Sequence, residues 1–310
     1  MNTFWGNEEL NPTLFANPVV TIGNFDGCHL GHQEIFKRVK AHAFKINGTS
    51  VVYTFNPHPA SIILDDHYQK LIFTLQEKID AIKVMGIDSL VIVPFTKDFA
   101  SIPAETFVED ILVGKLGIKG LVVGHDFVFG KRGRGDAALL RRMGDKFDFF
   151  VDRVEEIFFE NILVSSSKIR SLIQEGNVGL ARKLMYYPYQ LPGEVIHGKS
   201  RGHGLGFPTA NLRPFKTLIP AEGVYAAFTY VENKKMKSAV NIGSNPTFGD
   251  TDLSIEVFIF DLDKDLYGKH IAIEFIEKIR GEVKFPDASS LVKQIEIDCS
   301  NAKKILEKEL

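Results

Sequence analysis

The sequence predicts an α/β protein whose first part is a doubly wound parallel sheet and whose second part is a small antiparallel β-barrel with a terminal helix. Up to about residue 185, short and uniformly apolar runs alternate with amphipathic helical runs, as in consecutive βαβ units. Beyond that point, short β-type runs separated by turn residues lead into one final helical run. A chain of 310 residues can bury two cores, so we expect two domains, 1–185 and 186–310.

In the first domain, strands are expected where apolar residues run without alternation, which is typical of strands buried on both faces. Helices are expected where apolar residues recur at helical spacing, as Ile35, Val39 and Ala43 do. The expected strands are 18–25, 50–55, 89–95 and 119–124, and the expected helices are 32–47, 75–86 and 104–117. Ligands of such sheets bind beyond the carboxyl ends of the strands, where the motifs discussed below lie.

The first domain is expected to end with a helix that finishes near Met185 and leads into a Tyr- and Pro-rich connector. Strands are then expected at 193–198, 223–233, 236–243, 253–262 and 269–279. The last helix is expected from Asp287, which follows Pro286 and suits the N-cap position.

Composition limits the partners. The chain has 37 basic and 39 acidic residues, so no global positive field attracts nucleic acid, and an anionic substrate must be gripped locally. The two cysteines, Cys28 and Cys299, form no disulfide framework and suit a reducing cytosol. No signal peptide and no apolar run near the ~18 residues of a membrane span is evident. We therefore expect a cytoplasmic protein that acts on small molecules without nucleic acid or membrane; the sequence does not predict its oligomeric state.

The stretch "TIGNFDGCHLGH" (21–32) places His29 and His32 between the end of an expected strand and the start of an expected helix. These histidines can cap the helix, bind a metal or contact a phosphate. Metal binding is disfavoured, because helical ligand pairs prefer i, i+4 spacing and no third ligand is nearby. A helix N-terminus attracts anions, and imidazoles there can stabilise charge on a transferring phosphate. Phosphate chemistry is favoured, and a structural role stays open.

The string "GNFDGCHLGH" resembles the signature of the nucleotidyltransferase superfamily, which transfers a nucleoside monophosphate unit from ATP to a phosphate-bearing acceptor. "SSSKIR" (165–170) resembles the second motif of that superfamily, although alone it reads as a serine-rich N-cap. The resemblance implies a Rossmann-like first domain with His29 and His32 as catalytic residues. The ATP-binding residues that it implies are Gly23, Phe25, Ser166 and Arg170.

Two further segments resemble the acceptor side of bacterial bifunctional riboflavin kinase/FMN adenylyltransferases: "TFNPHP" (54–59) and "VVGHDFVFGKRGRGD" (122–136). Judged by residue type alone, "NPHP" is a rigid turn, the two phenylalanines are core candidates, and the basic group Lys131, Arg132 and Arg134 is a solvated loop or an anion-steering patch. The flavin-binding residues that the resemblance implies are Asn56, Pro57, His58, Pro59, Asp126, Phe127 and Phe129.

In the second domain, "HGKSRGHGLGFPTANL" (197–212) joins a Gly-rich loop to a turn that carries Thr209 and Asn211. Glycines let backbone N–H groups approach phosphates, and hydroxyl and amide oxygens are hard ligands that suit Mg²⁺. "GFPTAN" resembles the nucleotide-binding motif of riboflavin kinases. That resemblance implies Mg²⁺ at Thr209 and Asn211 and ATP binding by Gly204, Gly206, Thr209 and Asn211.

A kinase also needs a group that aligns or deprotonates the acceptor hydroxyl. In "SIEVFIFDL" (254–262), strand alternation places Glu256 on one face with Ser254, Phe258 and Phe260. A desolvated carboxylate of this kind gains the raised pKa of a general base, and a structural role is the alternative. The resemblance to riboflavin kinases places the catalytic glutamate at Glu256. "NIGSNPTF" (241–248) and "DLYG" (265–268) match the same family, and "IRGEVKF" (279–285) resembles its flavin-side flap, which implies flavin contacts from Arg280 and Glu282.

The resemblance spans about residues 18–300 and implies riboflavin, FMN and FAD as substrates and products, with Mg²⁺ accompanying ATP. The chain departs from the family pattern at Cys28, Asn56, His203 and the connector "MYYPYQ" (185–190). Two alternatives remain. One is a nucleotidyltransferase for phosphopantetheine or nicotinamide mononucleotide that carries an inert barrel, and the other is a flavin-binding regulator that acts on RNA or a protein partner.

Overall fold

The computed structural model describes residues 1–64, 70–197, 206–244 and 253–309. The chain forms two compact units. The first unit comprises Met1–Gln69 and Phe73–Ser166, and the second comprises Lys70–Ile72 and Ser167–Leu310.

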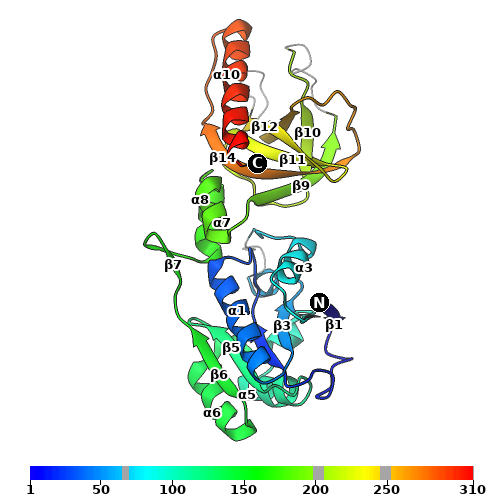
Figure 1. The fold of residues 1–310 in the computed structure, drawn as a ribbon, viewed down its shortest axis with the longest axis vertical. Helices are drawn as coiled ribbons and strands as arrows, with labels where there is room; N and C mark the ends of the chain where they lie inside the picture. The colour runs from blue at the N-terminus through cyan, green and yellow to red at the C-terminus, as the bar shows by residue number, and fades with distance from the viewer. Residues whose placement is uncertain (65–69, 198–205, 245–252, 310) are drawn as a thin grey trace. The chain divides into compact units, whose positions relative to one another are not determined.

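The first unit contains a six-stranded parallel sheet, which confirms the predicted doubly wound fold (Figure 1). The strand order is β1-β4-β3-β2-β5-β6. The strands are β1 (Asn2–Trp5), β2 (Val19–Ile22), β3 (Ser50–Phe55), β4 (Ser89–Val93), β5 (Gly120–Gly124) and β6 (Phe150–Val154). The edge strands β1 and β6 were not expected, because "NTFW" and "FVDRV" mix polar with apolar residues and lack the apolar runs of the four central strands.

The connections between these strands are mostly helical. The helices of the first unit are α1 (Leu30–Lys45), α2 (Pro59–Ile63), α3 (Leu75–Val84), α4 (Lys97–Ala100), α5 (Ala104–Thr106), the π-helix η2 (Phe107–Val113), the 3₁₀-helix η3 (Lys131–Gly133) and α6 (Ala137–Phe147). A short hairpin of β7 (Phe158–Phe159) and β8 (Ile162–Leu163) follows β6. The helix expected at 104–117 is present over 104–113, but it is not α-helical throughout: after α5 the chain widens into η2, where Gly114 N–H donates to Glu109 O over 2.9 Å.

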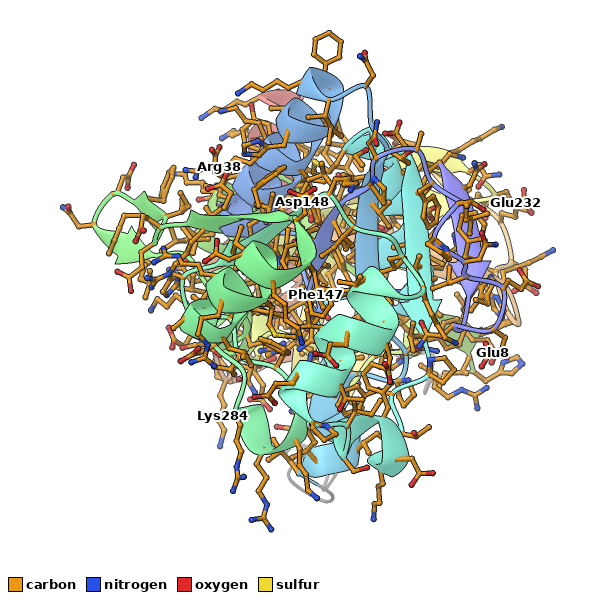
Figure 2. All side chains as sticks on the ribbon, turned by 90° about the horizontal axis from the view of Figure 1, so that it is seen from below. Glu8, Arg38, Phe147, Asp148, Glu232 and Lys284 are labelled. Atoms are coloured by element: carbon orange, nitrogen blue, oxygen red, sulfur yellow. The ribbon has the colours of Figure 1, made fainter. Side chains whose placement is uncertain are left out.

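Helices cover both faces of the sheet. Helix α1 buries Ile35, Phe36, Val39 and Ala43 and contacts β2, β3 and β5. The opposite face packs against η2 and α6, and its core includes Val20, Tyr53, Phe107 and Leu140. In Figure 2, α1 with Arg38 lies on one side of the strands and α6, ending at Phe147, lies on the other. This arrangement leaves the carboxyl ends of the strands for ligand binding.

The long segment of the second unit begins with α7 (Ser166–Gln174, of which Ser166 belongs to the first unit) and α8 (Val178–Met185), and α8 packs against β14 and β9. A closed antiparallel barrel follows in the order β10-β13-β12-β11-β14-β9, as predicted. Its strands are β9 (Tyr189–Ile196), β10 (Ala210–Pro214), β11 (Gly223–Val231), β12 (Lys234–Ser244), β13 (Leu253–Ile259) and β14 (His270–Arg280).

The barrel differs from the expectations in two places. The strand expected at 193–198 begins at Tyr189, because Tyr189 and Leu191 are buried and continue the alternation of Val195 through the connector. The segment after Thr209 was expected to be a turn, yet it forms β10, whose backbone pairs with both β9 and β13.

The terminal helix α10 (Ala288–Glu307) is confirmed, and Asp287 caps it by accepting a 2.7 Å hydrogen bond from Ser290 N–H. It contacts β11, β12 and β14 and buries Ala302 and Leu306 against Phe228 (Figure 1). Within the described part of the chain, every helix is too short or too polar to cross a membrane.

Candidate active sites

Three of the sequence motifs follow neighbouring strands of the first unit. Strand β2 is central and pairs with β3 on one side and β5 on the other. The histidine motif follows β2, "NPHP" follows β3, and "HDFVFG" follows β5. Because these parallel strands end at the same edge of the sheet, the three segments lie together beyond the carboxyl ends of the strands, as the sequence predicted.

The loop between β2 and α1 has an unusual backbone. Phe25, Gly27 and Cys28 have φ values of 49°, 84° and 36°, in the left-handed region that non-glycine residues rarely adopt. Both non-glycine side chains are buried, and the Cys28 thiol and N–H donate to Phe25 O over 3.4 and 3.3 Å. Such conformations cost energy and gather at functional sites. Gln33 Nε2 also donates to Cys28 O over 3.0 Å, which fixes the loop to α1.

His29 and His32 lie together at the start of α1. His29 is the N-cap, and its Nδ1 accepts a 3.4 Å hydrogen bond from His32 N–H. The two imidazole rings stack with centroids 3.7 Å apart and 18° between planes. Since Nδ1 of His29 accepts, the proton of its neutral ring is assigned to Nε2. The capping and phosphate interpretations are therefore compatible. In the described residues, no group of three His, Cys, Asp or Glu side chains is placed to hold a metal ion.

The remaining ATP-binding candidates of this domain lie in both units. Gly23 and Phe25 belong to the loop itself, and Ser166 Oγ donates to Asp26 O over 2.8 Å. Arg170 belongs to the second unit, where it is buried and its Nε donates to Lys70 O over 2.9 Å.

The "NPHP" turn contains a cis peptide bond between Asn56 and Pro57. Asn56 and Pro57 are exposed and Pro59 is half-buried, whereas His58 is buried and caps α2 through a 3.1 Å hydrogen bond from Ala60 N–H to its Nδ1. His58 therefore shapes the turn, and Asn56 and Pro57 present its outer surface.

After β5, Phe127 and Phe129 stack with centroids 5.6 Å apart and 15° between planes. Phe129 is buried and contacts Phe107 of η2, whereas Phe127 is half-buried and Asp126 is exposed. Phe129 is therefore a core residue that supports Phe127, and only Phe127 and Asp126 of the three have surface to offer a ligand. The basic residues 131, 132 and 134 are exposed.

In the second unit, a row of polar side chains crosses three strands of the barrel. Glu256 of β13 lies directly opposite Asn211 of β10 on one side and Asn241 of β12 on the other. Side chains directly opposite one another in an antiparallel pair point to the same face, with Cβ atoms about 5 Å apart. Phe258 borders the row on the same face and makes an edge contact with Phe207. Thr209 is half-buried just before β10, and Gly206 is exposed. Gly204 lies outside the described residues.

The flap candidates Arg280 and Glu282 have different surroundings. The Arg280 guanidinium forms a bidentate pair with the buried Asp298 of α10, with Nε and Nη2 at 3.0 and 2.8 Å from Oδ2. Glu282 reaches over β12, because a Cβ placed on Gly243 would lie 2.0 Å from its Oε1. Burial raises the pKa of Glu282, the charge of Glu222 raises it further, Arg280 opposes this, and Glu256 adds to it.

Sequence reasoning missed Asn241 as a member of this site. Its position opposite Glu256 follows from the β12–β13 register, which a sequence pattern does not reveal.

A parallel sheet with paired histidines at a helix N-terminus, joined to a barrel with an asparagine–glutamate row, defines a two-domain enzyme of phosphate transfer. Comparison with known protein families shows to which family of such enzymes the chain belongs. Residues 12–168 match the FAD synthetase family, and residues 185–306 match the riboflavin kinase family. The chain belongs to the bifunctional riboflavin kinase/FMN adenylyltransferase family.

Relatives of that description cover nearly the whole chain. The protein from Buchnera aphidicola (Acyrthosiphon pisum) is 38% identical over 91% of both chains, and that from Bacillus subtilis is 38% identical over 93% of this chain and 92% of its own. The Escherichia coli K12 protein is 34% identical over 90% of each. A crystal structure titled a macrolide-efflux protein, from Streptococcus pneumoniae, has a TM-score of 0.87 at 31% identity and covers 98% of this chain and 99% of that one.

Proposed function

We infer that the chain phosphorylates riboflavin to FMN and adenylylates FMN to FAD, with ATP as the donor in both reactions. The adenylyltransferase is the first of its two domains and the kinase the second, which is the order in which the two families match. We propose 1–185 and 186–310 as the extents of these domains and the cytoplasm as the location.

The observation that carries the kinase assignment is the direct pairing of Asn211 with Glu256 across β10 and β13. In the proposed reaction, the riboflavin 5′-hydroxyl attacks the γ-phosphorus, and Glu256 accepts the proton that leaves this hydroxyl. The bond from the γ-phosphorus to the β-phosphate oxygen breaks and ADP departs. Phosphoryl transfer depends chiefly on positioning and charge neutralisation, which Thr209 and Asn211 would supply with the Gly-rich segment of Gly204 and Gly206.

Mg²⁺ fits the donor set of this site. The Asn211 amide, the Thr209 hydroxyl and the Glu256 carboxylate are hard oxygen donors on or beside one barrel face. Thr209 and Asn211 would hold the ion, whose charge would offset that of the ATP phosphates. The Arg280 guanidinium is bound by Asp298, so Arg280 would position the flap (279–285) beside the flavin. Glu282 of this flap would contact the flavin.

In the proposed adenylyl transfer, a phosphate oxygen of FMN attacks the α-phosphorus of ATP and pyrophosphate departs. His29 and His32 would donate hydrogen bonds to the charge that develops on the phosphorus oxygens and the leaving group. Loop residues Gly23 and Phe25 would border the nucleotide, and Ser166 and Arg170 would hold the β and γ phosphates. The flavin would lie along Phe127 and the "NPHP" turn, with Asp126 nearby and His58, Pro59 and Phe129 as support.

The proposal is tested by incubating the purified chain with riboflavin, ATP and Mg²⁺ and separating FMN from FAD by chromatography. Removal of one transition-state donor costs ~10²–10³-fold, so His29→Ala should lose FAD formation to that extent and keep FMN formation. Glu256→Gln should lose FMN formation and still convert added FMN to FAD. His42→Ala and Glu277→Gln are the matched controls, since His42 lies in the last turn of α1 and Glu277 is exposed on β14. Loss of both activities in either test variant would refute the division of labour.

The two alternatives predict other outcomes. A nucleotidyltransferase with an inert barrel would form no FMN from riboflavin, and the Asn211–Glu256 pairing would have no purpose in it. A flavin-binding regulator would form neither product. Neither alternative explains why the paired histidines and the Asn211–Glu256 pair occur in one chain.

A further inference from the structure

Helix α3 carries a buried cation that belongs to none of the motifs. Lys78 is only 6% exposed, and lysine is rarely buried to this extent without a partner. It lies in the first turn of α3, whose start is fixed by a capping box between Thr74 and Glu77. The positive end of the helix dipole disfavours a lysine there. Two unfavourable settings, burial and the helix N-terminus, indicate that Lys78 serves something other than helix stability.

The Lys78 ammonium reaches the carboxyl end of β3. Its Nζ lies 3.4 Å from Phe55 O and 3.5 Å from Thr54 Oγ1. Thr54 Oγ1 in turn donates to Asn24 O over 3.4 Å, in the loop that follows β2. Phe55 directly precedes the Asn56–Pro57 turn, and Asn24 lies in the histidine loop. One side chain therefore connects, directly or through one hydroxyl, the two loops assigned to flavin and to ATP.

The histidine loop also contains Asp26, whose side chain is buried and only 2% exposed. Its Oδ1 accepts a 2.9 Å hydrogen bond from Phe73 N–H. Burial lowers the pKa of Lys78, and the negative charge of Asp26 opposes that lowering. The Lys78 ammonium and the Asp26 carboxylate thus interact within a desolvated region, where charges are weakly screened. A carboxylate close to a polyanionic nucleotide is unfavourable unless a cation offsets it, and Lys78 supplies such a charge.

We propose that Lys78 is a positioning residue for adenylyl transfer. It fixes the histidine loop relative to the "NPHP" turn and offsets the charge of Asp26. This inference rests on the proposed assignment of those loops to ATP and FMN. Lys78 itself touches neither substrate; it acts through Thr54, Phe55 and Asp26.

The bifunctional chain provides its own control. We expect Lys78→Met, which keeps the length of the side chain and removes the charge, to lower kcat/KM for FAD formation by about 10²-fold, the cost of a displacement of about 1 Å in a reacting pair. Riboflavin phosphorylation by the same preparation should stay within twofold. Lys83→Met is the matched control, because Lys83 is exposed on the same helix. If Lys78→Met unfolds the first unit at the assay temperature, Lys78→Gln, which keeps an N–H donor, replaces it.

A double-mutant cycle distinguishes positioning through charge from a general loss of packing. Asp26→Asn keeps the acceptor for Phe73 N–H and removes the charge. If Lys78 and Asp26 act together, the double variant should lose no more FAD formation than the worse single variant. Losses that multiply, or a Lys78→Met chain with normal FAD formation, would overturn the inference. His29→Ala in the same series separates the role of Lys78 from the assignment of the adenylyltransferase site. If only His29→Ala loses FAD formation, the role of Lys78 is wrong. If neither His29→Ala nor Lys78→Met loses it, the site assignment is wrong.

Discussion

The placement of Glu282 over Gly243 gives a sharp prediction for the kinase reaction. Gly243 is a β12 residue opposite Ser254 of β13, and its lack of a side chain leaves the space that the Glu282 carboxylate occupies. In Gly243→Ala, the new Cβ would lie 2.0 Å from Glu282 Oε1 and 2.9 Å from its Cδ. Real Cβ atoms essentially never lie within 3.0 Å of such an atom, so the carboxylate must move by about 1 Å or more.

A displacement of this size matters only if Glu282 helps to place riboflavin. Misplacement by about 1 Å in a reacting pair costs about 10²-fold, so kcat/KM for riboflavin phosphorylation should fall by 10- to 100-fold. The backbone of Gly243 lies outside the left-handed region, so alanine adds no backbone strain. The unfolding temperature should therefore change little, and FAD formation from added FMN should be normal.

Steady-state kinetics with varied riboflavin, followed by chromatography of FMN, measures the effect. Gly281→Ala is the matched control, because a Cβ at Gly281 meets no atom within 4 Å although it neighbours Glu282. If Gly243→Ala phosphorylates riboflavin as fast as the unaltered chain, the position of Glu282 is irrelevant and its assignment to the flavin site is wrong.

Three further predictions concern single side chains. Thr209→Ala should raise the Mg²⁺ concentration for half-maximal FMN formation by about 10-fold or more, and leave the Mg²⁺ response of FAD formation unchanged. Phe127→Ala should raise KM for FMN by about 2- to 13-fold, since an aromatic stacking contact contributes ~0.5–1.5 kcal/mol; an unchanged KM would place the flavin elsewhere. The raised pKa of Glu282 means that the folded state binds more protons than the unfolded state, so its contribution becomes unfavourable as pH rises from about 4.5 through the raised value. Glu282→Gln should therefore raise the unfolding temperature of the second unit at pH 7 but not at pH 4, and the opposite order would contradict the assigned cause.

The sequence predicted the architecture because each domain has its own periodicity. The apolar runs of β2 to β5 identify buried parallel strands, and the alternation of Ile255, Val257 and Ile259 identifies a barrel strand with one buried face. The elements that were not predicted correctly have no periodic sequence signal. The strands β1 and β6 are short edges, and the π-helix η2 differs from an α-helix only in its hydrogen-bond spacing.

The sites were predicted less completely, because they depend on strand register. The motif residues His29 and Glu256 could be found from short strings, but the opposition of Glu256 to Asn241 follows only from the pairing of β12 with β13. The connection of Lys78 to Thr54 likewise joins residues 24 positions apart through a helix whose own pattern reveals only amphipathicity.

The central claim is that each domain binds its own ATP. Equilibrium titration of the intact chain with a non-hydrolysable ATP analogue and Mg²⁺, in the presence of FMN, measures this directly. The account predicts two moles of analogue bound per mole of chain, one of them lost in Thr209→Ala at limiting Mg²⁺. A stoichiometry of one, with both reactions still proceeding, would contradict it.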